Sequence, residues 1–394
     1  MNNRTEKPVV IGTVGAGYAA SLHARGYAKV GGVPVRLKYI CDVQTDRAEQ
    51  LRKQYGHEQV TADFEVLLKD PEVDVIDITL PPFLHIPFAI RALRAGKHVI
   101  CEKPLTGYFG KPGQENVGNT VPKAEMYRAC LAEMDELKKV VEETGKKFMY
   151  AENFVYATPV QKAAEILRAK KSKILYMRGE ESLKGSSSAV AGLWNRTGGG
   201  TLTRTGTHPL GGMLWLKQQE AAARGETITL KDVTCDVGNA TFCLTEEEHK
   251  FISARPEDVE DYGVLSLTFS DGTKLLCIAA DTVLGGSRNY IDIYANNTAL
   301  KCNITPTDLL DTYFPDEAGL EDVYLSEMLP MKLGWNKAFV SDEVIRGYMD
   351  EMQDFMECVA FDREPLSGFQ LAYDITKVTY AAYLSAEEGR RFEF

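Results

Sequence analysis

The sequence predicts an α/β protein in two parts: an N-terminal domain with a parallel sheet, and a C-terminal α+β domain with a large, open, mostly antiparallel sheet. Strand-like and helical runs alternate over the first 150 residues, which is typical of a parallel sheet. Beyond them strand-like runs dominate, and Asp271-Gly272 is a strong hairpin signal. We expect domains at 1–150 and 151–394, with a C-terminal helix (about 371–387) packing back toward the first domain.

In the N-terminal part, buried apolar runs predict the strands and periodic runs predict the helices. Strands are expected at residues 9–14, 35–41, 73–79, 98–101 and 148–150. Helices are expected at residues 19–30, 46–55, 84–95 and 124–144. Residues 106–123 are rich in Gly, Pro and Asn and predict a surface loop, which covers the site, contacts another subunit or is an idle insertion.

The C-terminal part is expected to begin with a helix at residues 159–170. Its strands are expected at residues 174–177, 228–237, 264–269, 274–279 and 290–294. One face of such an open sheet carries the site and the other is free for subunit contacts. We therefore expect a homo-oligomer, either a dimer or a tetramer.

Composition excludes several classes of protein. The 394 residues have ordinary globular proportions, and a net charge of −11 argues against a nucleic-acid binder. No apolar run reaches transmembrane length, and the polar start lacks the pattern of a secretory signal, so we expect a cytoplasmic protein without membrane partners. The eight cysteines are scattered along the sequence, and we expect them to be buried thiols. The sequence contains neither the residue spacing of a metal site nor the Gly-x-Ser-x-Gly motif of a serine hydrolase.

A glycine-rich turn, Gly15-Ala16-Gly17-Tyr18-Ala19-Ala20, separates the first predicted strand from the first predicted helix. Gly15 permits a tight turn, and Gly17 lets a pyrophosphate approach the backbone at the helix N-terminus. Ala20 keeps the helix close to the strand, while Tyr18 and Ala19 open the helix beside the phosphates. The turn predicts a dinucleotide cofactor.

Asp42 ends the second predicted strand, roughly 20 residues beyond Ala20. A carboxylate at this position accepts hydrogen bonds from the adenosine ribose hydroxyls and repels a 2′-phosphate. This favours NAD over NADP, although Arg47 could reach toward a phosphate.

These features, together with Cys101-Glu102-Lys103-Pro104 after a strand and a Gly198-Gly199-Gly200 segment leading to His208, resemble the Gfo/Idh/MocA oxidoreductases from about residue 9 to residue 385. The resemblance implies a Rossmann domain and an enzyme that takes a hydride from a sugar or cyclitol carbinol with NAD(P). It also implies cofactor contacts from Thr79, Pro81, His85, Glu102 and Lys103. His85 could equally be a surface histidine of the helix N-terminus.

Oxidation of a secondary alcohol requires a group that accepts the hydroxyl proton, and Lys103 and His208 are the candidate catalytic residues. By resemblance, Lys103 orients the substrate hydroxyl. The resemblance breaks near His208, because Arg204 stands at one acidic position of the family segment and Gly211 at another. An arginine lowers the pKa of a neighbouring histidine, yet neutral imidazole remains a competent base.

Arg204 is a candidate substrate ligand for a carboxylate, a phosphate or sugar hydroxyls, or else forms a salt bridge to Glu180 or Glu181. Trp194 is expected to stack on a sugar ring, and Lys184 to pair with hydroxyls, unless their segment is a lid without direct contacts. Asn153 and Tyr156 are further candidates, with Tyr156 as a core aromatic in the alternative.

Three functions are compatible with these residues. The first is an NAD-dependent dehydrogenase of a sugar, cyclitol or glycoside, including oxidation of a glucoside at C3. The second is a redox-neutral, glycosidase-like enzyme that oxidises, eliminates and re-reduces, with Glu181 or Tyr156 as a base near C2. The third is a cofactor-binding regulator without catalysis. The sequence leaves the substrate, the carbon oxidised and the oligomeric state open.

Overall fold

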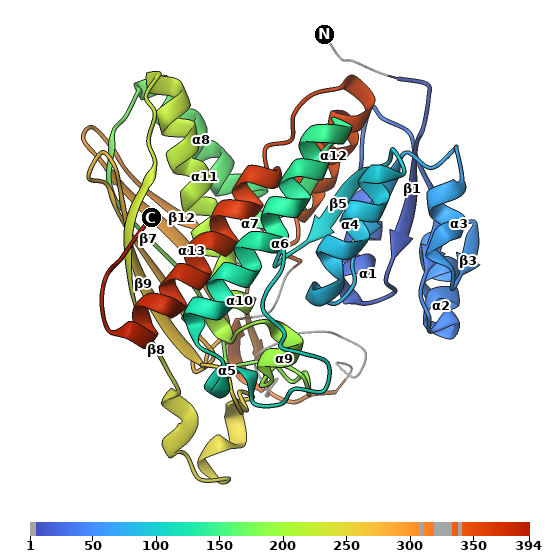
Figure 1. Cartoon of the computed structure of the whole chain (residues 1–394). Coiled ribbons are helices and arrows are strands. Elements are labelled where there is room, and N and C mark those ends of the chain that lie inside the picture. The colour runs from blue at the N-terminus through green and yellow to red at the C-terminus, as the bar shows by residue number, and fades with distance from the viewer. Residues whose placement is uncertain (1–4, 307–309, 319–332, 338–340) are drawn as a thin grey trace. The chain divides into compact units, whose positions relative to one another are not determined.

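A computed structural model describes residues 5–306, 310–318, 333–337 and 341–394 (Figure 1). The chain forms two compact units, each assembled from separate segments. Unit 1 comprises Met1–Phe109, Ala124–Tyr156 and Gly347–Tyr380, and unit 2 comprises Gly110–Lys123, Ala157–Arg346 and Ala381–Phe394. The expected division into residues 1–150 and 151–394 therefore differs from the two observed units, which are both discontinuous in sequence.

Unit 1 is built on a parallel sheet with the strand order β3-β2-β1-β4-β5-β6. Its strands are β1 (Val9–Val14), β2 (Val35–Cys41), β3 (Gln59–Thr61), β4 (Val75–Ile78), β5 (His98–Glu102) and β6 (Phe148–Ala151). The strand order reverses between β1 and β4, and the carboxyl ends of strands at such a point form a ligand-binding crevice. The predicted parallel α/β fold is confirmed.

The helices of unit 1 bury the faces of this sheet. They are α1 (Tyr18–Tyr27), α2 (Thr45–Tyr55), α3 (Phe64–Lys69), α4 (His85–Arg94), α6 (Lys123–Thr144), α7 (Asn153–Tyr156), α12 (Tyr348–Phe361) and most of α13 (Phe369–Glu388). Helix α12, which the sequence analysis missed, packs across α1. A Cβ at Gly26 would lie 2.5 Å from Met352 Cγ, so this close approach draws the late segment into unit 1.

Unit 2 contains a seven-stranded sheet with the order β12-β11-β7-β10-β9-β8-β15. Its strands are β7 (Ile174–Ser182), β8 (Leu230–Gly238), β9 (Tyr262–Phe269), β10 (Lys274–Ala280), β11 (Arg288–Ala295), β12 (Ala299–Asn303) and β15 (Phe392–Glu393). Only the β7–β10 pair is parallel, which confirms the mostly antiparallel prediction. A small ribbon of β13 (Asp311–Phe314) and β14 (Gly334–Lys337) is separate.

The long helices α8 (Thr158–Lys170) and α11 (Thr207–Arg224) of unit 2 pack together, and α11 contacts β7, β10 and β11. Alternation along β10 follows from this: Leu275, Cys277 and Ala279 are buried, whereas Leu276 and Ile278 are only half-buried. The shorter helices are α5 (Val117–Thr120), α9 (Trp194–Thr197) and α10 (Thr201–Arg204).

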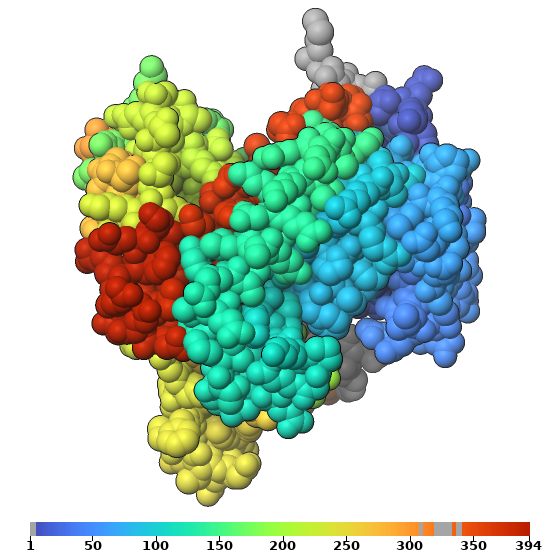
Figure 2. Space-filling model, viewed as in Figure 1, coloured from blue at the N-terminus to red at the C-terminus, as the bar shows by residue number. Residues whose placement is uncertain are grey.

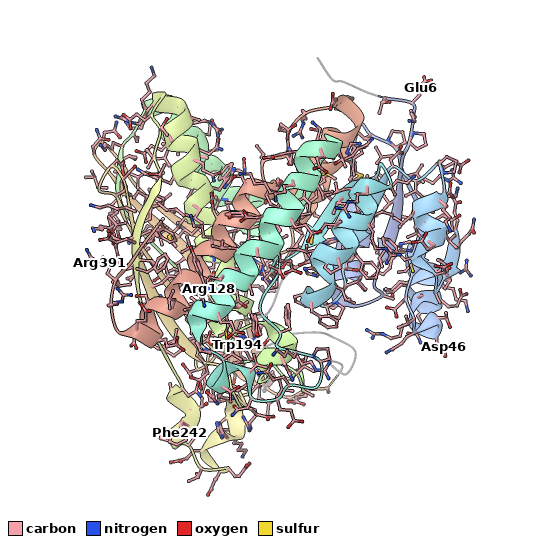
Figure 3. All side chains as sticks on the ribbon, viewed as in Figure 1. Glu6, Asp46, Arg128, Trp194, Phe242 and Arg391 are labelled. Atoms are coloured by element: carbon pink, nitrogen blue, oxygen red, sulfur yellow. The ribbon has the colours of Figure 1, made fainter. Side chains whose placement is uncertain are left out.

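Residues 239–252, with the short helices η2 (Ala240–Cys243) and η3 (Glu248–Phe251), project from unit 2 (Figure 2). Phe242 in this projection is 88% exposed (Figure 3). All eight cysteines lie in the described part of the chain as free thiols, and Cys243 is exposed, in contrast to the expected burial. Among the described helices, none has the length and apolar character needed to cross a membrane.

Candidate active site

The glycine turn joins β1 to α1 in the conformation that its sequence predicts. Gly15 has a φ of +99°, and a Cβ there would lie 2.6 Å from the Thr79 carbonyl oxygen, so only glycine fits. Gly17 is the N-cap residue of α1, and a Cβ there would meet nothing within 4 Å. The backbone beside the helix N-terminus is therefore open to a ligand, which suits an anionic phosphate.

Asp42 follows β2 and holds the glycine turn directly. Its carboxylate accepts the Ala16 N–H at 2.7 Å through Oδ2 and the Gln44 N–H at 2.7 Å through Oδ1. A carboxylate has about four acceptor positions, so this fixed group can still accept ribose hydroxyls. On the other side of the turn, the Thr79 hydroxyl donates to Val14 O and lies 3.0 Å from Gly15 O.

A pocket of about 560 Å³ opens over this turn. Of the sequence-predicted cofactor residues, its lining includes Gly15, Gly17, Tyr18, Ala19, Asp42, Thr79 and Pro81. Ala20 lies behind it in a small core with Ile40 and Ala48. Phe64 and Phe88, which the sequence analysis missed, stack 4.6 Å apart at the pocket wall. The residues present thus fit a dinucleotide, with a polar cradle for phosphates and an apolar wall beside it.

His85 lies at the start of α4, is 1% exposed and does not line this pocket. Its Nδ1 is 2.8 Å from Pro104 O and its Nε2 is 2.7 Å from Leu80 O, while burial lowers its pKa. Because each ring nitrogen faces a carbonyl oxygen, the imidazole links the two loops that follow β4 and β5. This is a positioning role rather than the cofactor contact or surface histidine considered from the sequence.

Lys103 follows β5, whose carboxyl end lies next to that of β4 in the sheet. The Lys103 N–H donates to Glu102 Oε2 at 2.9 Å, and the Lys103-Pro104 peptide bond is cis. Burial would raise the pKa of Glu102, but His23 and Lys103 hold it below its usual value. The predicted lysine thus stands at the ligand-binding edge of the sheet, beside an ionised carboxylate.

His208 and Arg204 lie in unit 2, at the start of α11 and the end of α10. His208 is 4% exposed, and its backbone N–H donates to Thr205 O. Arg204 forms an ion pair with the buried Asp281 after β10, in place of the expected Glu180 or Glu181. Burial raises the pKa of Asp281, and Arg204 opposes this shift. Because Lys103 belongs to unit 1, its cooperation with His208 stays a prediction.

Trp194, which is labelled in Figure 3, is only 2% exposed, so its indole is buried. Its ring packs 5.0 Å from that of Tyr383, with Lys123 Nζ 4.5 Å from the indole centroid. In this position it anchors the segment before α10 rather than presenting a face to a sugar ring. Lys184, by contrast, is half-buried just beyond β7.

Asn153 and Tyr156 belong to α7 in unit 1, and both are at most 1% exposed. The Tyr156 hydroxyl donates to Asp354 Oδ2 at 2.7 Å and accepts the Ser367 N–H at 3.0 Å. Burial, together with the nearby Asp354, raises the pKa of the Tyr156 hydroxyl well above its usual value. Tyr156 is therefore a core aromatic with a satisfied hydroxyl, the alternative considered from the sequence.

Three acidic residues that the sequence analysis missed fix backbone segments of unit 2. Asp258 accepts the backbone N–H groups of Gly118 and Trp194, and Glu260 accepts those of Gly200 and Leu202. Asp261 accepts those of Ala240 and Thr241. The loop at 106–123 is thus packed into unit 2 through residue 118. The acid-rich run 257–261 before β9 was the available sequence signal.

Comparison with known families identifies the N-terminal part of the chain. Residues 9–113 match the family model described as an oxidoreductase family with an NAD-binding Rossmann fold. This segment contains β1 to β5, the glycine turn, Asp42 and Lys103. The expected cofactor, NAD, therefore agrees with both the family and the pocket.

Levoglucosan dehydrogenase from Pseudarthrobacter phenanthrenivorans is 36% identical over 102 residues, which cover 24% of this chain and 26% of that protein. D-glucoside 3-dehydrogenase from Escherichia coli is 33% identical over 101 residues, 25% of this chain and 28% of that protein. The matches thus span about a quarter of these relatives. The structure of GenD2 from gentamicin A biosynthesis, in complex with NAD, has a TM-score of 0.77 at 20% identity, covering 99% of this chain and 98% of that one.

Proposed function

Because this chain belongs to the Gfo/Idh/MocA family of oxidoreductases, we propose that it is an NAD-dependent dehydrogenase of a secondary hydroxyl on a sugar, cyclitol or glycoside. The observation that carries the proposal is the pocket at the β1–β4 switch point in unit 1. There a glycine cradle and a fixed Asp42 lie on the same sheet as Lys103, which follows the strand adjacent to β4.

When bound, NAD supplies the acceptor for the hydride that leaves the carbinol carbon. Gly15 and Gly17 leave room for the pyrophosphate, and Asp42 orients the ribose. Lys103 donates to the substrate oxygen and stabilises the negative charge that develops as its proton leaves. His208 accepts that proton. The assignment to Lys103 and His208 is tested by Lys103→Met and His208→Asn, each expected to lower kcat about 10²–10⁴-fold.

We propose a neutral polyhydroxylated substrate, because Arg204 is already matched by a carboxylate. A free guanidinium would favour an anionic substrate, whereas the ion pair with Asp281 compensates its charge. Two relatives are named for levoglucosan and for oxidation of D-glucosides at C3, which makes glycosides the first compounds to test.

The deciding experiment incubates the purified protein with NAD or NADP and a panel of sugars, sugar acids, cyclitols and O- or C-glycosides. We expect a keto product in proportion to reduced nicotinamide, with NAD preferred over NADP. Aglycone released without net reduction would instead establish the redox-neutral reaction. In that case Glu181 is the remaining candidate base, since Tyr156 is held by Asp354. NAD binding without turnover on the whole panel would favour a regulator.

We also propose that the protein acts as a homo-oligomer through one face of the unit 2 sheet. Val264, Leu276, Ile278 and Tyr290 share this face in register and remain half-buried. These side chains lie beside the charged Arg178 and Glu180 of β7, and a face that mixes apolar and charged groups is typical of a subunit contact. Sedimentation of the wild type against Ile278→Arg tests this, and a monomeric wild type would contradict it. The expected cytoplasmic location stays a prediction.

A further inference from the structure

A network of polar side chains lies at the end of β5 in unit 1. His23 on α1 is 2% exposed and places Nδ1 2.9 Å from Asp77 Oδ1 on β4. Its Nε2 lies 3.2 Å from Glu102 Oε1 at the end of β5. The Tyr27 hydroxyl donates to the other Asp77 oxygen at 2.9 Å. One helix is thereby connected to two neighbouring strands.

The charged groups of this network surround the His23 imidazole. His23 faces Asp77, Glu102, Tyr27 and, from α12, Glu351. Although burial lowers its pKa, the two carboxylates raise it well above the usual value, so His23 is an imidazolium at neutral pH. Burial raises the pKa of Glu351 well above its usual value, and the nearby His23 opposes this shift.

Glu102 is the member of this network that contacts the backbone of Lys103. Its Oε1 faces His23, and its Oε2 accepts the Lys103 N–H at 2.9 Å. The other ionisable groups around it are His85 from α4, Tyr150 from β6, Glu351 from α12, and Asp77, Cys101 and Lys103. His23 is the buried cation against this carboxylate, and Lys103 contributes the second positive charge.

We infer that His23 is a positioning residue for Lys103, acting through Glu102. The imidazolium keeps Glu102 ionised and in place, and Glu102 then fixes the main chain at Lys103. Because His23 belongs to the helix that opens at the glycine turn, the lysine and the cofactor cradle are held by the same element. An error of about 1 Å in the position of a catalytic group costs about a hundredfold in rate, so such an indirect contact affects turnover. This inference rests on the proposed dehydrogenase function.

A double-mutant cycle tests the route through Glu102. His23→Gln removes the charge and is expected to lower kcat about 10–100-fold, with the dissociation constant of NAD changed less than about threefold. Glu102→Gln retains an acceptor for the Lys103 N–H. The double variant should be no slower than Glu102→Gln, because the carboxylate that His23 serves is gone. Additive losses would overturn the route. His98→Gln, at the other end of β5, is the matched control and keeps wild-type kcat.

The pH profile separates positioning from a general loss of structure. Without His23, Glu102 is buried beside only one cation, so its pKa rises and it protonates at higher pH. The acid limb of kcat/KM should move up by about one pH unit in His23→Gln. This shift should be absent from the double variant, which must give the same pH profile as Glu102→Gln because it has no carboxylate to titrate at this position. A lower rate with an unmoved limb would show a merely structural role.

Hydrogen exchange gives a readout that does not need turnover. In His23→Gln, the backbone amides of residues 101–105 should exchange about tenfold faster, since the Lys103 N–H loses its fixed acceptor. Exchange in the peptide containing Gly15 and Gly17 should be unchanged. Faster exchange throughout unit 1, or no change at 101–105, would overturn the inference. If the substrate panel gives no activity but this local change occurs, the proposed function fails and the positioning of Lys103 stands.

Discussion

Replacement of Gly17 by alanine separates binding from folding at the cofactor cradle. The backbone φ of Gly17 is −91°, which any residue adopts, and its Cβ would meet nothing within 4 Å. The change therefore leaves the folded state unstrained and restricts the unfolded chain, for a gain of about 0.4–1 kcal/mol. The added methyl group nevertheless enters the pocket where a pyrophosphate approaches. We expect NAD affinity to fall about 10–100-fold, or about 1.4–2.7 kcal/mol.

Gly15→Ala is the matched comparison, because its effect acts on the fold. At a φ of +99° an alanine costs about 1–2 kcal/mol. Its Cβ would also lie 2.6 Å from the Thr79 carbonyl oxygen, an overlap that costs about 1–3 kcal/mol. A unit of this size loses about 2–4 °C in Tm for each kcal/mol. Gly15→Ala should thus melt well below the wild type.

Calorimetric melting and titration with NAD measure the two quantities on the same samples. Gly17→Ala should melt at or slightly above the wild-type Tm and lose affinity, while Gly15→Ala should lose both stability and affinity. Wild-type NAD affinity in Gly17→Ala would refute the placement of the pyrophosphate at this turn. A large fall in its Tm would show that the position is packed rather than open.

Three further predictions concern single side chains. Lys217→Met leaves the buried Glu220 without its ammonium partner and should destabilise unit 2 by about 3 kcal/mol. Burial already raises the pKa of Glu220, so in the variant the folded state binds a proton at this carboxylate more readily than the unfolded state does. The decrease in Tm caused by the substitution should therefore be smaller at pH 5 than at pH 8. Asp42→Ala should weaken NAD binding more than NADP binding, because loss of the Ala16 contact affects both cofactors whereas loss of the ribose contact affects NAD alone; equal losses for both would contradict the ribose role. Tyr156→Phe should cost about 1–3 kcal/mol, because the Ser367 N–H loses its acceptor and Asp354 loses one of its donors, and kcat at 25 °C should be unchanged. A fall in kcat alone would restore its site role.

The α/β fold could be predicted from local pattern because both sheets depend on it. Five apolar strands separated by helices predict a parallel sheet, and Asp271-Gly272 predicts a hairpin between β9 and β10. The short, largely polar strand β3 was not predicted. Helix α12 was not predicted, and its place in unit 1 depends on contact between Met352 and Gly26, far apart in sequence. Such long-range packing leaves no periodic signal of its own.

For the site, the sequence by itself determined the cofactor cradle, because phosphate binding at a turn depends on backbone conformation that Gly15 and Gly17 encode locally. Only the tertiary structure decided which polar side chains face each other. Arg204 meets Asp281 rather than Glu180, Trp194 is enclosed, and His23 reaches Glu102. The physical reason is that the charge and exposure of a side chain are set by groups from other elements, which the sequence order does not place beside it.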